Sequence, residues 1–266
     1  MDRTFLKIGL ISIALSLLVS CGGEFNLFSA SADKNSDKAL LYDANRALEA
    51  KDFETAISKI QSMSTAAQAE DDTLRLLGSA YGGQCGLEFV PFQTGFSDSS
   101  DTLSNFLLTH FEDADVDSQT ACKNAETAFD GISADGLTQS DYIARVYLAM
   151  SKIGSIVNTE GALVDNTLDP GFDPCSDIPS SFNAETGDQA KELFTALVRL
   201  FTNLASAGLD TAVSALPPAI EALLTDTDIA DVDSSEEKLA LTVINANEIG
   251  LDVCGADSSD VGCVCP

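Results

Sequence analysis

The stretch of sequence that decides the fold runs from residue 138 to residue 157 and reads TQSDYIARVYLAMSKIGSIV. Its large apolar residues recur every three or four positions, at Ile143, Val146, Tyr147, Met150, Ile153 and Val157. This period places them on one face of an α-helix, for which Thr138 or Ser140 supplies an N-terminal cap. The stretch therefore predicts a long amphipathic helix that buries one face.

The same helical period extends over most of the chain. A second stripe consists of Leu193, Leu197, Leu200 and Leu204 and ends at Gly208, a residue type common at helix C-termini. Alternation of apolar and polar residues, which is typical of strands, is absent over any useful length. We therefore predict an all-α domain over residues 39–266, in which helical hairpins stack as an array or form an irregular bundle cross-linked by disulfides.

The first twenty residues have the three-part layout of a secretory signal. Arg3 and Lys7 charge the start, and an apolar run of about a dozen residues follows over residues 8–19. A run this short does not cross about 30 Å of hydrocarbon, which needs about 20 residues, so we expect residues 1–20 to be removed. The run ends in Leu18-Val19-Ser20-Cys21, which resembles the lipobox of bacterial lipoproteins.

The lipobox resemblance implies a covalent membrane anchor at Cys21. In that family the cysteine receives a thioether-linked diacylglycerol, the signal is cut before it, and the new amino terminus is acylated, for example with palmitate. Gly22 follows the cysteine where an Asp would oppose onward transport, so the resemblance implies the outer membrane. Residues 21–38 then form the lipidated start and a flexible tether. In the alternative interpretation Cys21 is a seventh disulfide cysteine after ordinary signal cleavage.

The charge of the chain limits its partners. The sequence carries 14 basic and 42 acidic residues, a formal net charge of −28, with 45% apolar residues. Such a surface repels nucleic acid and anionic lipid headgroups, so we expect no nucleic-acid partner and a membrane contact made by the lipid itself. The apolar content is that of a folded protein and not of a disordered acidic chain.

Six cysteines follow Cys21, namely Cys85, Cys122, Cys175, Cys254, Cys263 and Cys265. Export permits disulfides, and three bridges with fifteen open connectivities are the simplest interpretation. Cys263 and Cys265 are too close to pair with each other, so we expect each to reach back and pin the tail, residues 251–266, to the body. A thiolate metal site around Cys254, Cys263 and Cys265 is the alternative.

One motif suggests internal repeats. Leu77-Gly78-x-x-Tyr81 resembles the first-helix signature of a tetratricopeptide repeat, and Ala44 stands 34 residues before Gly78, in the matching position. Between them, residues 51–57, KDFETAI, resemble the start of the second helix of such a repeat.

The resemblance covers about residues 39–83 and implies paired helices that stack in an array. In such an array small residues let paired helices approach, and aromatic residues fill the space between pairs; the corresponding residues are Ala44, Ala56, Gly78, Phe53 and Tyr81. Val90-Pro91 departs from the pattern, so we expect loops to interrupt the array. An irregular bundle with one accidental match is the alternative.

The sequence contains little that points to catalysis. His110 is the only histidine, and its position on an apolar face predicts packing or helix capping. Neither a Gly-x-Ser-x-Gly elbow nor a phosphate-binding loop occurs. Acidic stretches at residues 113–124 and 226–237 begin like EF-hand loops but lack the required Gly or Glu, which favours solvated loop charge. We therefore predict a protein that is not an enzyme and needs no cofactor or metal.

Two functions remain open at this stage. The first is a membrane-anchored interaction module that binds another protein or peptide in the cell envelope, because the repeat resemblance implies interaction and not catalysis. The alternative is a small-molecule-binding lipoprotein that serves a transporter. An enclosed apolar cavity of several hundred Å³ would favour the alternative.

Overall fold

The computed structural model describes residues 35–87, 107, 110–111, 116–160, 177–178, 189–208 and 240. These residues form seven α-helices and one short 3-10 helix, without a strand, so the predicted all-α class is confirmed for this part of the chain. The predicted signal, lipid attachment site and tail lie outside the described residues. The same holds for Cys21, Cys175, Cys254, Cys263 and Cys265.

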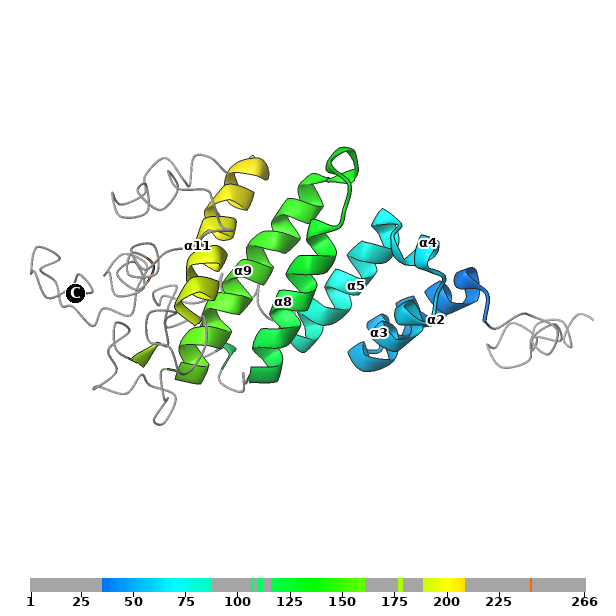
Figure 1. Cartoon of the computed structure of the whole chain (residues 1–266), viewed down its shortest axis with the longest axis horizontal. Helices are drawn as coiled ribbons and strands as arrows, with labels where there is room; N and C mark the ends of the chain where they lie inside the picture. Colours follow the sequence, from blue (N-terminus) through cyan, green and yellow to red (C-terminus); the bar gives the residue numbers. More distant parts are fainter. Residues whose placement is uncertain are drawn as a thin grey trace, which may run out of the picture.

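The long helices form a row of three pairs (Figure 1). The first pair is α2 (Asp37–Glu49) with α3 (Phe53–Gln61), the second is α5 (Asp71–Gln84) with α8 (Val116–Asp130), and the third is α9 (Gln139–Glu160) with α11 (Gln189–Ser206). The helices of each pair pack on each other, and α3 also packs on α5 and α8 on α9. The row therefore runs in chain order from α2 at one end to α11 at the other.

Two short helices join the pairs. The first, α4 (Thr65–Gln68), lies between α3 and α5, and η1 (Ala134–Gly136) lies between α8 and α9. The helices of the second pair are separated by residues 85–115.

Side-chain caps set the starts of the helices. The Ser36 hydroxyl accepts a hydrogen bond from the Ala39 amide, so α2 begins at Asp37. At α9, the Thr138 hydroxyl accepts from the Asp141 amide while the Asp141 carboxylate accepts from the Thr138 amide. Thr138, and not Ser140, is therefore the cap of α9.

The apolar clusters are shared between neighbouring pairs. The first pair, α4 and α5 enclose Leu40, Ala44, Ile60, Met63, Ala67 and Leu76, and the second pair encloses with α9 a cluster around Phe129 and Leu148. In α11 the predicted residues Leu193, Leu197 and Leu200 are buried, and Gly208 ends the segment with a φ of 78°, which favours glycine.

One of the expected disulfides joins the helices of the second pair. Cys85, directly after α5, is bonded to Cys122 of α8, and both residues are fully buried. The bridge spans 37 residues, for which the chain-entropy model gives a stabilisation of roughly 4 kcal/mol. It fixes the end of α5 against α8 across the interrupting segment.

Candidate functional site

The small residues of the predicted repeat lie where helices approach each other. Ala44 and Ala56 are fully buried in the first pair. Gly78 of α5 faces α8, and a Cβ atom at this position would lie 2.7 Å from the Cε2 atom of Phe129. Any larger residue at position 78 would therefore push the second pair apart.

The larger repeat residues lie between neighbouring pairs. The Phe53 ring of α3 rests against the backbone of Gly83 in α5, a contact that the sequence analysis did not anticipate. Leu77 packs against the cluster that contains Leu40 and Ile60, and with Tyr81 it also packs against a smaller cluster of Ala47, Ala56, Ile57 and Ala80. Tyr81 packs in addition against the cluster around Phe129 and Leu148. The Tyr81 hydroxyl also accepts a hydrogen bond from Gln61 at 3.2 Å. These residues join the first pair to the second.

A recurring contact closes the first two pairs. Asp37, the first residue of α2, accepts hydrogen bonds from the amide and hydroxyl of Ser64 at 2.7 and 2.6 Å. Asp71, the first residue of α5, accepts the same two bonds from Ser133 at 3.0 and 2.7 Å. Each serine stands three residues after the second helix of its pair and directly before the short helix that leads onward. We call these contacts the pair clasps.

The third pair has a related clasp. Gln139, the first residue of α9, donates from its side chain to the Ala207 carbonyl at 2.8 Å, directly after the end of α11. Asp37 and Asp71 are 34 residues apart, which is also the spacing of Ala44 and Gly78. The clasps and the sequence signature therefore follow the same period in the first two pairs.

Hydrogen bonding lowers the pKa of both clasp aspartates. The Ser64 hydroxyl and amide hold the pKa of Asp37 below its usual value, and the Ser133 amide and hydroxyl do the same for Asp71. Both groups are therefore charged down to lower pH than an ordinary aspartate.

A partly buried ion pair joins the second pair to the third. Arg75 of α5 donates to both carboxylate oxygens of Asp141 at 2.9 and 3.1 Å, and to the Gly136 carbonyl at 2.5 Å. Burial alone would raise the pKa of Asp141, but hydrogen bonds from Arg75 and Thr138 outweigh it and hold that pKa below its usual value. The start of α9 is thereby fixed against α5.

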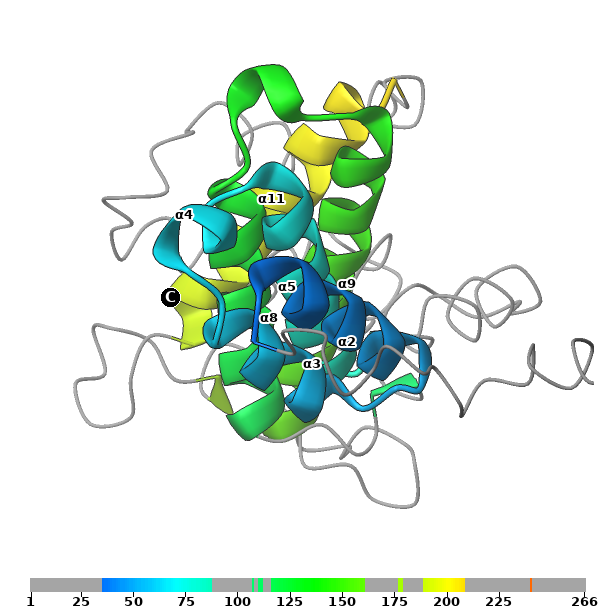
Figure 2. The ribbon, with the colours of Figure 1, turned by 90° about the vertical axis from the view of Figure 1, so that its right-hand side faces the viewer.

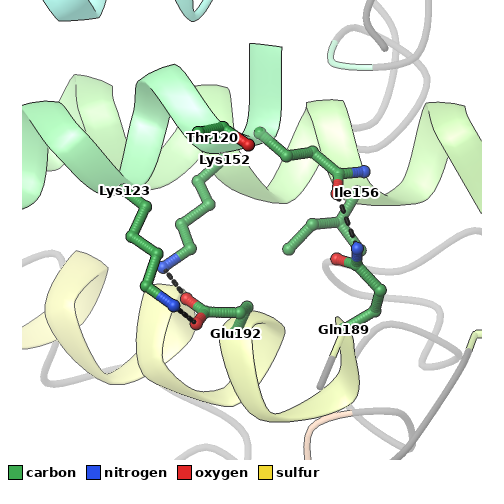
Figure 3. Close-up of a pocket in the computed structure, with 7 residues that line it drawn as sticks. Thr120, Lys123, Lys152, Ile156, Gln189 and Glu192 are labelled. Atoms are coloured by element: carbon green, nitrogen blue, oxygen red, sulfur yellow. Dashed lines mark hydrogen bonds and ion pairs between the residues drawn. The ribbon is translucent and has the colours of Figure 1, made fainter. Parts of the chain in front are cut away.

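A cavity lies where α8, α9 and α11 meet, and it is the candidate binding site of the described residues (Figure 3). Its volume is about 250 Å³. The lining is mostly polar and consists of Gln119, Thr120, Lys123, Lys152, Ile156, Gln189 and Glu192. It lacks the Phe and Leu lining that would have favoured an apolar small-molecule receptor.

The centre of this site is a buried lysine between two carboxylates. Lys152 of α9 is 2% exposed, and its ammonium lies 2.7 Å from a Glu126 oxygen and 2.5 Å from a Glu192 oxygen. The other Glu192 oxygen accepts from Lys123 at 2.9 Å. Burial alone would raise the pKa of Glu192, but Lys152 and Lys123 outweigh it and hold that pKa below its usual value. These four charges sum to zero, which offsets the cost of burying them.

A polar stripe on α8 forms one wall of the site. Gln119, Lys123, Glu126 and Asp130 are spaced by four, three and four residues, so they share one helical face. The Gln119 side chain accepts from Gln189 of α11 at 2.6 Å, but its own amide nitrogen is buried without a hydrogen-bond partner. Side chains of this stripe therefore bridge α8 and α11, since Gln119 binds Gln189 and Lys123 binds Glu192.

At the far end of the stripe Asp130 binds two arginines. It accepts both bonds of a bidentate pair with Arg199 of α11, at 3.1 and 2.7 Å, and lies 3.9 Å from Arg145 of α9. Burial alone would lower the pKa of Arg199, but Asp130 and Glu126 outweigh it and raise that pKa. The three helices are thus held together by charge as well as by apolar packing.

The sequence analysis missed this polar network. The helical spacing on α8 was a detectable signal of a shared face, but surface stripes have the same spacing. Glu192 follows Lys152 by 40 residues, and the sequence contains nothing that pairs them.

The predicted absence of metal or catalytic chemistry stays a prediction. In the described residues no cluster of three or more His, Cys, Asp or Glu side chains is arranged to hold a metal ion. His110 is half-buried, and its ring meets Phe111 edge-on with 5.0 Å between ring centroids, which accords with the predicted packing role. Residues 116–124 of the first acidic stretch belong to α8, whereas residues 113–115 and the whole stretch 226–237 lie outside the described residues.

Comparison with known proteins finds no matching family model, no matching curated protein and no matching solved structure. None of the helices in the described ranges is long and apolar enough to cross a membrane.

Proposed function

We propose that this protein is a non-enzymatic lipoprotein of the bacterial cell envelope whose helical array binds another protein or peptide. The observation that carries the proposal is the row of three helix pairs, each closed by a clasp from the first residue of its first helix. Stacked helix pairs present extended continuous surfaces of the kind that bind proteins and peptides. The lipobox at residues 18–21 supports the location.

The helix pairs are further proposed to be divergent repeats of the tetratricopeptide type. Three features support this: the 34-residue spacing of the aspartates Asp37 and Asp71, the same spacing of Ala44 and Gly78, and the packing of each pair on the next. The long segment between α5 and α8 is then an insertion within the second repeat.

The charge of the chain favours a basic partner. A net charge of −28 attracts cationic surfaces and speeds their encounter at low ionic strength. The partner class proposed is therefore an envelope protein or peptide with a basic binding surface.

Affinity capture from detergent-solubilised envelopes tests the proposal. The full chain is the bait, and an unrelated acidic protein of similar net charge is the control for nonspecific attraction. Cys21→Ala, which changes only the anchor, is expected to retain the partner, whereas Asp71→Ala with Ser133→Ala, which opens the clasp of the second pair, is expected to weaken capture. Enrichment no greater than with the acidic control would contradict the proposal.

The cavity between α8, α9 and α11 favours a second candidate, a small-molecule-binding lipoprotein. Its supporting observation is Gln119, which lines the cavity and has a buried amide nitrogen without a partner. Native mass spectrometry of the purified protein tests this candidate. A retained small molecule that is lost on Gln119→Leu would favour it over the interaction module.

A further inference from the structure

The basic residues are unevenly distributed along the chain. Residues 34–59 carry five basic and five acidic residues, whereas residues 60–266 carry seven basic and 34 acidic residues. The first pair is thus nearly neutral, and the remainder of the chain accounts for almost all of the negative charge. The neutral end is also the end nearest in sequence to Cys21.

The outermost helix of the row, α2, presents two of these basic residues, Lys38 and Arg46, on one face. Leu40, Ala44 and Ala47 of α2 are buried against the rest of the row. Lys38, Tyr42, Asn45, Arg46 and Glu49 are exposed and fall on the opposite side of the helix. We call these five residues the outer face of α2.

Tyr42 is the centre of this face. It is 67% exposed, and among the described residues it is the only large hydrophobic side chain so exposed. Lys38 and Arg46 stand four residues to either side, on the adjacent helical turns. Figure 2 views the molecule from this end, with α2 and α3 toward the viewer.

An aromatic ring with a hydroxyl, flanked by two cations, is suited to a membrane–water interface. Tyrosine places its apolar ring at the level of the headgroups and keeps its hydroxyl hydrated. Each Lys or Arg close to an anionic bilayer contributes about 1 kcal/mol, and this contribution falls off within about one Debye length. Glu49, at the C-terminal end of the same face, offsets part of it.

The position of the anchor supplies the second argument. Cys21 precedes the first residue of α2 by 16 positions, so lipid on that cysteine keeps α2 within a short distance of the bilayer. The short tether gives α2 a high effective concentration at the bilayer surface, so even a weak attraction between α2 and the headgroups sets the orientation of the helix pairs. The acidic remainder of the chain is repelled from the same surface, which adds to the preference.

We propose that the outer face of α2 rests on the anionic headgroups of the membrane that holds the lipid anchor, so that the row of helix pairs extends away from the bilayer. This inference rests on the proposed lipid anchor. It refines the expectation from overall charge that the protein surface is repelled by anionic lipid, because that repulsion belongs to residues 60–266. The third pair, with the polar site, then lies at the membrane-distal end.

A single introduced tryptophan reports this contact, because the chain contains none of its own. Full-length lipidated Tyr42→Trp is reconstituted into vesicles of phosphatidylglycerol with phosphatidylcholine, or of phosphatidylcholine alone, that contain a brominated lipid quencher. Tyr142→Trp in α9 is the matched reporter away from α2. In the anionic vesicles we expect the indole emission of Tyr42→Trp to be quenched about twofold more than that of Tyr142→Trp, with the difference lost in phosphatidylcholine.

Charge reversal provides the second arm. Lys38→Glu with Arg46→Glu, placed in the Tyr42→Trp protein, is expected to abolish the extra quenching, whereas Lys191→Glu in α11 leaves it unchanged. Equal quenching of the two reporters, or quenching insensitive to Lys38 and Arg46, would overturn the inference. Vesicle flotation distinguishes failure of the proposed lipid anchor from failure of the proposed contact between α2 and the headgroups. Tyr42→Trp protein that floats but shows no quenching refutes only the α2 contact, and protein that does not float refutes the anchor and the contact together.

Discussion

Asp71 and Ser133, 62 residues apart, are joined by two hydrogen bonds that close the second helix pair. The carboxylate of Asp71 accepts both bonds, one from the amide and one from the hydroxyl of Ser133. The same arrangement joins Asp37 to Ser64 in the first pair. A contact repeated at equivalent positions indicates that the pairs are built on one plan.

Removal of a clasp is expected to loosen the pair that it closes. Ser133→Ala deletes the hydroxyl donor to Asp71 and is expected to lower the melting temperature by about 2–4 °C. The control is Ser79→Ala in α5, whose hydroxyl donates only to the Arg75 carbonyl of its own helix. Circular dichroism on heating measures both, and equal melting temperatures for the two variants would refute a structural role for the clasp.

The clasps also predict a dependence of stability on pH. The pKa values of Asp37 and Asp71 are below the usual 3.8, so the folded protein binds fewer protons than the unfolded chain. Their stabilisation is therefore complete above the unfolded pKa and is lost as the pH falls through the lower folded pKa. In the Asp37→Asn, Asp71→Asn protein, the urea concentration at the unfolding midpoint should change less with pH between about pH 5 and about pH 2 than it does in the wild type. Asp141 and Glu192 shift in the same direction, so part of the wild-type slope should remain.

The buried lysine of the third pair is expected to be strongly coupled to its carboxylates. Lys152→Met leaves Glu126 and Glu192 without their shared ammonium, and should lower the free energy of unfolding by about 3–5 kcal/mol. The same substitution at Lys59, whose pair with Asp43 is half-exposed, should cost less than about 1 kcal/mol.

A second substitution separates lost charge from lost packing. Glu192→Gln in the Lys152→Met protein should recover roughly 1 kcal/mol or more, because it removes the net negative charge that Glu126, Glu192 and Lys123 carry together without Lys152. Urea unfolding of the four proteins of this cycle gives the coupling energy. Strictly additive effects would contradict the ion cluster.

The disulfide between Cys85 and Cys122 leads to one expectation for the peptide map and one for the stability of the fold. Proteolysis without reduction should release a cross-linked fragment that contains Cys85 and Cys122. Replacement of both by alanine should destabilise the fold by up to roughly 4 kcal/mol, the value expected for a loop of this length. Detection of either cysteine linked to a different partner would show that this pairing is wrong.

Local sequence was sufficient to predict the helical fold class and a helix cap. The capping role of Thr138 follows from residue type and position, because a cap depends on neighbours in the chain. The apolar stripe of α11 was predictable from its period for the same reason. The close approach at Gly78 was implied only by the tetratricopeptide resemblance, because its partner Phe129 belongs to another helix.

The polar network was not predictable in this way. Lys152 lies outside the predicted apolar stripe of α9, on the opposite side of the helix, and the carboxylates that make its burial tolerable come from α8 and from α11. Likewise, Ser133, the partner of Asp71, follows 62 residues later in the chain, after α8. Such contacts depend on which helices pack against each other. That packing depends on residues far apart in the chain, so local sequence patterns do not predict it.

The account depends most on the lipid anchor, which places the helical array at a membrane and orients it. The direct measurement is metabolic labelling with a fatty acid in the bacterial host, with wild-type protein and Cys21→Ala compared at equal expression. Label in the wild type and none in Cys21→Ala is the predicted result. No label in the wild type, or equal label in both proteins, would contradict it.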